Sequence, residues 1–304
     1  MIMGDRDMTD INYKLLQMIM SDFSNDKICD ELHITKKELK YRINTIKSEG
    51  FNITKNYNYN GTRSYIFNKD VLDDDDIISI DGEIKGKGFR ALAIADTHIG
   101  NGKDNMKYID AIYNYCIEKN IHIVFHAGDL FDGDIPYSLQ PKEQFEKFLA
   151  LYPCENDILT FLVFGNHEES FLTKYGINLK TVIEKYRDDI VPLGYGERLV
   201  RLSNIKDDIV MCHNPRGIQT HGVVISGHSH RYKFVADDYH PQIIVPTLSD
   251  YLHTCDYPGA VELYIESYNK VRYLMLKHLV IDENEKIRVV SKVEHKSSKN
   301  YVRK

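Results

Sequence analysis

The 304 residues predict an α/β protein with a small N-terminal domain of three helices and a hairpin, followed by a larger domain of alternating strands and helices. Two observations lead to this prediction. Three short helical patterns and a strong hairpin signal fall within the first 69 residues. Beyond them, five short runs rich in Val, Ile, Leu and Phe each end at a polar turn, which is typical of buried strands.

The first 69 residues have the element order of a winged helix-turn-helix domain. Apolar residues at helical spacing, with Ser24 and Thr35 available as N-caps, predict helices over residues 11–20, 27–32 and 36–48. Two strand patterns then flank Asn60-Gly61, a dipeptide that favours a tight hairpin turn. In such a domain the third helix would enter the major groove of DNA.

The third predicted helix is basic, which indicates contact with phosphates and predicts a nucleic-acid partner, DNA rather than RNA. The candidate contacts on this helix and on the hairpin are Lys36, Lys37, Lys40, Arg42 and Arg63. A solvated helix face, or a winged helix that docks a protein, explains the same charges. The net charge of −6 also argues against a broadly cationic surface.

The larger domain has the pattern of a sheet with helices against its faces. The apolar runs that predict its strands cover residues 89–95, 121–125, 159–164, 209–212 and 223–226. Helical spacing predicts helices over 106–119 and 140–152 between them. Alternating patterns over 261–265 and 271–280 predict strands that complete a second sheet.

Each apolar run is followed by side chains that bind divalent metals. These segments are Asp96-Thr97-His98, Gly128-Asp129, Gly165-Asn166-His167-Glu168, His213 and Gly227-His228-Ser229-His230. Carboxylates, imidazoles and one amide oxygen suit a pair of cations such as Mn²⁺, Fe²⁺ or Zn²⁺. Strand ends are also where α/β sheets usually bind ligands. A two-metal centre of this composition predicts hydrolysis of a phosphate ester.

The five segments, in this order, resemble the motifs of the calcineurin-like metallophosphoesterases, over residues 89 to about 250. The resemblance implies a four-layer α/β/β/α sandwich that holds two divalent ions, with Mn²⁺ expected and Fe, Zn or Ni as alternatives. The implied ligands of the first ion are Asp96, His98, Asp129 and His230. The implied ligands of the second are Asp129, Asn166, His213 and His228.

The same resemblance implies the roles of two catalytic residues. Asp129 would bridge the two ions, and a hydroxide between them would attack phosphorus in line. His167 would act as general acid and protonate the leaving oxygen. Asp132 and Asp134 are interpreted as turn residues, and His126 and His253 as histidines near the motifs that could touch substrate.

A narrower resemblance favours nucleic acid as the substrate. The segment from Ala127 to Asp132, read with Asp96 to Gly100, is similar to the nuclease branch related to Mre11 and SbcD. The leading hypothesis is therefore a phosphodiesterase or nuclease. A phosphatase or phosphodiesterase for small or cyclic nucleotides is one alternative. A DNA-binding regulator with a phosphoesterase-fold sensor domain is another.

The sequence also predicts boundaries and a compartment. The expected order is a winged helix-turn-helix domain over residues 1–69, an acidic linker over 70–88, a phosphoesterase domain over 89–295 and a basic tail over 296–304. The run Asp73 to Asp76 supports the linker. No apolar stretch is long enough to span a membrane, and five scattered cysteines favour a cytoplasmic protein. The family resemblance implies a homodimer.

Overall fold

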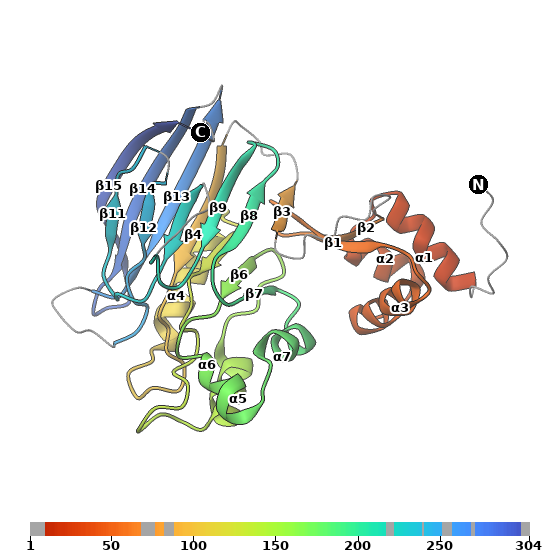
Figure 1. Ribbon diagram of the computed structural model, residues 1–304, viewed down its shortest axis with the longest axis horizontal. Coiled ribbons are helices and arrows are strands. Elements are labelled where there is room, and N and C mark those ends of the chain that lie inside the picture. The colour runs from red at the N-terminus through yellow and green to blue at the C-terminus, as the bar shows by residue number, and fades with distance from the viewer. Residues whose placement is uncertain are drawn as a thin grey trace.

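The computed structural model describes residues 10–67, 77–81, 88–216, 222–238, 240–250, 257–268 and 271–298. Its strands form a seven-stranded and an eight-stranded sheet that pack face to face (Figure 1). Apolar side chains from both sheets form one continuous core between them. The protein is therefore a mixed α/β structure, as the sequence predicts.

The seven-stranded sheet carries the first three predicted motif strands. Its order is β15-β14-β13-β4-β5-β6-β7. Four of its strands run parallel, namely β4 (Gly88–Ile94), β5 (Ile123–His126), β6 (Leu159–Val163) and β7 (Ile190–Gly194). In β4, Ala91 and Ala93 face the second sheet while Leu92 and Ile94 face the helices. The strand is thus buried on both faces, which explains its unbroken apolar sequence.

Four helices cover the outer face of the seven-stranded sheet. They are α4 (Met106–Lys119), α5 (Pro141–Leu151), α6 (Glu169–Tyr175) and α7 (Leu179–Tyr186). Their apolar side chains share a second core with that sheet. The two sheets and these helices make three layers, and the expected fourth layer stays a prediction. No helix in the described part of the chain is long and apolar enough to cross a membrane.

The C-terminal strands extend the first sheet, where the sequence predicted completion of a second one. They are β13 (Gly259–Tyr268), β14 (Val271–Ile281) and β15 (Ile287–Ser298). Strand β13 pairs antiparallel with β4, and β14 and β15 follow as an antiparallel ribbon. Alternating side chains predict a strand but not its partner, because pairing is set by contacts distant in sequence.

The eight-stranded sheet has the order β11-β12-β10-β9-β8-β3-β1-β2. Its central and C-terminal members are β8 (Arg198–Leu202), β9 (Asp207–Met211), β10 (Val223–Ser226), β11 (Lys233–Val235) and β12 (Gln242–Ile244). Strands β9 and β10 run parallel, so the residues that follow them lie at the same edge of the sheet.

The N-terminal elements form where the sequence predicts them. They are α1 (Asp10–Met20), α2 (Asn25–Leu32), α3 (Lys36–Ser48), β1 (Ile53–Asn58) and β2 (Arg63–Phe67). The Ser24 and Thr35 side chains accept hydrogen bonds from the backbone N–H groups of Lys27 and Glu38, so both predicted N-caps are confirmed. The helices and the hairpin share their own apolar core. We refer to residues 10–67 as the N-terminal unit.

Part of the segment expected to be a linker is a strand. Strand β3 (Ile77–Asp81) pairs in parallel with β1 on one side and with β8 on the other. The hairpin β1-β2 is therefore the edge of the eight-stranded sheet, and the three helices lie beyond it to one side (Figure 1). The acidic run Asp73 to Asp76 and residues 299–304 of the expected tail lie outside the described residues.

Candidate metal centre

The five motif segments converge from both sheets. Asp96, Asp129 and Asn166 follow β4, β5 and β6 of the seven-stranded sheet. His213 and His228 follow β9 and β10 of the eight-stranded sheet. Because the strands within each set are parallel, the residues after them meet at one edge of the sandwich. The fold thus brings together segments that are up to about 130 residues apart in the chain.

The backbone at this edge is strained. Left-handed φ angles between 47° and 69° occur at five of the predicted ligands, which are Asp96, His98, Asp129, His228 and His230. Such a conformation costs about 1–3 kcal/mol per residue and persists mainly where function requires it. Gly128 and Gly165 permit the close packing, since a Cβ at Gly128 would lie 2.6 Å from His213 Nδ1 and one at Gly165 would collide with Asp129.

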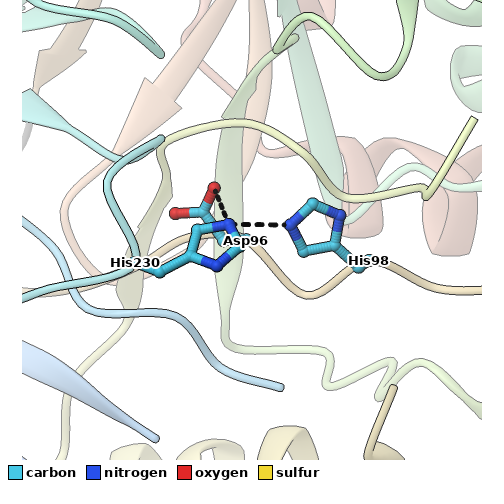
Figure 2. A group of neighbouring side chains, drawn as sticks. All are labelled: Asp96, His98 and His230. Atoms are coloured by element: carbon cyan, nitrogen blue, oxygen red, sulfur yellow. Dashed lines mark hydrogen bonds and ion pairs between the residues drawn. The ribbon is translucent and has the colours of Figure 1, made fainter. Parts of the chain in front are cut away.

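The first candidate ligand group consists of Asp96, His98 and His230 (Figure 2). His98 Nε2 and His230 Nε2 lie 3.1 Å apart, and His230 Nε2 lies 3.6 Å from Asp96 Oδ1. All three side chains are buried. Two ring nitrogens and a carboxylate oxygen that lie this close together could hold a divalent cation.

The second candidate ligand group consists of Asp129, His213 and His228. His213 Nε2 lies 3.0 Å from Asp129 Oδ2 and 3.2 Å from His228 Nδ1. His213 Nδ1 donates to the carbonyl oxygen of Ala127 at 2.9 Å, which directs Nε2 toward the group. The orientation of this ring therefore suits a metal ligand.

Asp129 links the second group to the first. Its carboxylate also forms a cluster with His98 and His167, so it is within reach of both candidate sites. The backbone N–H of His167 donates to Asp129 Oδ1 at 3.1 Å, and His167 Nε2 lies 3.9 Å from Asp129 Oδ2. Asn166, between Gly165 and His167, is exposed beside this cluster.

The electrostatics of the site favour a bound cation. Burial raises the pKa of Asp96 well above its usual range, and burial with the charge of Asp129 raises the pKa of Glu168 to about 7. Burial also opposes ionisation of Asp129, but its hydrogen bond to His213 outweighs this and lowers its pKa. In the described part of the chain, Asp96 and Asp129 form ion pairs with histidines only. Divalent cations would balance these carboxylates, so the residues fit a metal centre.

Asp132 has a place in the site that the sequence did not reveal. The sequence indicated a turn residue, yet the side chain is fully buried. Its Oδ1 lies 3.2 Å from His98 Nδ1 and 3.7 Å from His167 Nδ1, and its carbonyl oxygen accepts from His167 Nδ1 at 2.7 Å. One residue therefore orients both rings.

Glu168 is a second residue whose role was missed. Its buried carboxylate accepts hydrogen bonds from the backbone N–H groups of Asp129, Phe131 and Gly165 at 2.7 to 3.2 Å. It thereby ties the turn after β5 to the turn after β6. For both acids the available signal was a carboxylate close to a motif, Asp132 three residues after Asp129 and Glu168 directly after His167.

The remaining candidates lie elsewhere. His126 is fully buried, with Nε2 3.2 Å from the Thr97 hydroxyl oxygen, and burial lowers its pKa to about 3. It is a neutral packing residue out of reach of a substrate, and His253 lies outside the described residues. The five proposed nucleic-acid contacts lie on α3 and β2 of the N-terminal unit, away from the metal-binding segments.

The part of the chain that carries the motifs identifies the family. A model of the calcineurin-like phosphoesterases matches residues 89–248, which is more than half of the chain. The chain belongs to the calcineurin-like phosphoesterase family. The matched region includes every strand that carries a candidate ligand, and the His and Asp groups of this phosphoesterase could bind the divalent metals that the family uses.

Several solved structures are similar to this phosphoesterase. A predicted phosphoesterase from Streptococcus pneumoniae is 13% identical, with 69% of this chain and 98% of that chain covered and a TM-score of 0.39. An archaeal phosphodiesterase is 16% identical, with coverage of 67% and 99% and a TM-score of 0.40. Vps29 of Entamoeba histolytica in complex with zinc is 12% identical, with coverage of 69% and 99% and a TM-score of 0.35. Among curated protein sequences, none matches this chain.

Proposed function

We propose that this chain is a two-metal phosphodiesterase that cleaves DNA. The observation that carries the proposal is that Asp129 belongs to the second ligand group and also clusters with His98 of the first, where each group offers three ligand atoms within 4.8 Å of one another. We assign the first ion to Asp96, His98, Asp129 and His230, and the second to Asp129, Asn166, His213 and His228. Mn²⁺ is the ion that we would supply first.

The residues around these groups support hydrolysis of a phosphate ester. A pair of divalent cations supplies Lewis-acid activation of water and neutralises charge on the phosphoryl oxygens. His167 has its Nδ1 hydrogen held by the Asp132 carbonyl oxygen, so its Nε2 is the atom that can hold a proton for the leaving oxygen. The side chain is partly exposed, which allows contact with a substrate.

A DNA substrate is supported by the N-terminal unit. Three helices followed by a hairpin are the element order of a winged helix-turn-helix domain, and the third helix of such domains binds the major groove in DNA-binding proteins. Helix α3 carries five basic residues and one acidic residue, Glu38, which pairs with Arg42 at 2.6 Å. The segment from Ala127 to Asp132, which resembles the nuclease branch, supports the same substrate.

The experiment that tests this function compares substrates on one preparation. We would measure hydrolysis by Mn²⁺-loaded protein of single-stranded DNA, duplex DNA, bis-p-nitrophenyl phosphate and p-nitrophenyl phosphate, with Asp129→Asn as the control. DNA cleavage and diester hydrolysis that both disappear in the control are expected. Hydrolysis of the small esters alone would contradict a DNA substrate and favour nucleotides. No hydrolysis of any ester would contradict the enzyme assignment.

A further inference from the structure

Helix α3 presents two different polar faces, and one of them contacts the phosphoesterase part of the chain. Its core face consists of Leu39, Ile43 and Ile46. Four exposed side chains lie directly opposite that core face: Lys37, Tyr41, Asn44 and Ser48. Their spacing of four, three and four residues places them in one row along the helix. We call these four residues the outward stripe. The flank between the stripe and the core carries Lys36 and Lys40.

The flank of α3 and the hairpin are occupied by contacts with the phosphoesterase part of the chain. Lys40 Nζ donates to the backbone oxygen of Glu184 at 2.6 Å. Arg63 and Lys36 lie 3.1 and 3.7 Å from the Asp188 carboxylate. Three of the five residues that the sequence nominated as nucleic-acid contacts therefore face this interface.

The hairpin turn is also held in this interface. Gly61 has a φ of 80°, and a Cβ there would collide with the backbone of Asp157. Lys55 Nζ lies 3.5 Å from Glu184 Oε1. A cleft of about 120 Å³ remains between the two parts of the chain, lined by both positive and negative side chains. The mixed charge of this cleft fits an ionic interface better than a site for a polyanion.

The interface lies at the end of the sheet opposite the candidate metal centre. Asp157 precedes β6 and Asp188 precedes β7, whereas the metal-binding residues follow the parallel strands β4, β5 and β6. The five residues of β6, at about 3.3 Å each, separate the two ends by about 17 Å. This distance corresponds to about five base pairs of duplex.

We propose that the outward stripe of α3 is a docking surface for duplex DNA that anchors the substrate at a distance from the metal centre. The proposal rests on the DNA substrate proposed above. An α-helix fits the major groove of B-form DNA, and the narrow major groove of A-form RNA excludes it. Tyr41 is 72% exposed, and neither Lys37 nor Tyr41 has a side-chain partner among the described residues. A cation, an amide and a hydroxyl on one stripe are groups that contact phosphates and base edges.

The first test measures binding without cleavage. We would titrate a fluorescein-labelled 30-base-pair DNA duplex in EDTA, by fluorescence anisotropy, with wild type and with Lys37→Ala/Tyr41→Ala/Asn44→Ala. The triple variant is expected to bind at least about tenfold more weakly, and its dependence on salt should fall by about one unit of log–log slope. The matched control is Lys142→Ala, an 86% exposed lysine on α5, which should bind like wild type.

The second variant separates the two faces of α3. Lys36→Ala/Arg63→Ala removes the interface cations, and we expect its affinity for the duplex to stay within about threefold of wild type. The thermal midpoint of each variant is measured by circular dichroism. Loss of binding in this variant but not in the triple variant would overturn the proposal. So would unchanged binding in the triple variant, or tighter binding of duplex RNA than of DNA.

Hydrolysis of bis-p-nitrophenyl phosphate with Mn²⁺ separates this inference from the proposed function. The triple variant should hydrolyse the small diester at the wild-type rate and should raise the KM for a 60-base-pair duplex only. If wild type hydrolyses the diester but binds no duplex, the anchor is wrong and the phosphoesterase assignment stands. If wild type binds duplex through the stripe but hydrolyses no ester, the enzyme assignment is wrong and the anchor stands.

Discussion

Replacement of Asp132 by Asn is expected to impair hydrolysis while the protein stays folded. The buried Asp132 carboxylate accepts hydrogen bonds from Asn101 at 3.0 Å and from Ser138, and it lies 3.2 Å from His98 Nδ1. Asn has nearly the same shape, so the packing should survive. The charge of Asp132 favours a proton on Nδ1 of His98, and this keeps Nε2 available for the metal. The substitution removes that charge. The hydrogen bond from His167 to the backbone oxygen of residue 132 should persist.

Loss of such a carboxylate partner costs about 10- to 100-fold in metal affinity or activity, which is about 1.4 to 2.8 kcal/mol. The assay is hydrolysis of bis-p-nitrophenyl phosphate as a function of Mn²⁺ concentration, which separates kcat from the metal affinity. Asp134→Asn is the matched control, because Asp134 is on the same loop and pairs with the exposed Lys174. Wild-type kcat and Mn²⁺ affinity in Asp132→Asn, with circular dichroism unchanged, would refute the role that we assign to Asp132.

Three further predictions concern other contacts in the structure. His167→Ala should lower kcat for DNA by at least about 100-fold. It should lower kcat for bis-p-nitrophenyl phosphate less, because p-nitrophenolate leaves without a proton. Equal losses of kcat for the two substrates would contradict a general acid. Glu262→Gln should destabilise the protein by about 1–3 kcal/mol in urea, because the buried carboxylate contacts Arg90 and Lys277. Burial opposes ionisation of Glu262, but these cations outweigh it and lower its pKa. This stability should therefore be present above the ordinary pKa of a glutamate and be lost progressively as the pH falls below it through the lowered pKa. Gly61→Ala should lower the thermal midpoint; an unchanged midpoint would contradict the tight contact with Asp157.

The candidate site could be predicted from the sequence because each ligand directly follows a buried strand. The apolar run before Asp96 identifies a strand, and the position after it places the carboxylate at the edge of the sheet. Asp132 could not be assigned in this way. A carboxylate in a polar loop has the same local pattern whether it faces solvent or two histidines, and only the tertiary structure distinguishes the two.

The elements of the N-terminal unit were predictable, but their pairing was not. Caps and apolar spacing are local, so α3 begins and ends where Thr35 and the repeat of Leu39 and Ile43 predict. The parallel pairing of β3 with β8 joins residues about 120 positions apart, and nothing local indicates it. The same reason explains why Lys40 was listed as a nucleic-acid contact, since its partner Glu184 is 144 residues away.

The pairing of β3 determines how the N-terminal unit is connected to the candidate metal centre. A unit on a flexible linker would raise the local concentration of any bound duplex and leave its orientation free. Here the hairpin is the edge of the same sheet that carries His213 and His228, and Gly61 packs on the loop before β6. The first connection runs through paired strands and the second through a backbone contact at the hairpin turn, so we expect the outward stripe and the metal centre to keep one relative orientation. If the N-terminal unit binds a duplex as proposed, a rigid connection of this kind would select it by its length and direction, whereas a flexible linker would select it by affinity alone.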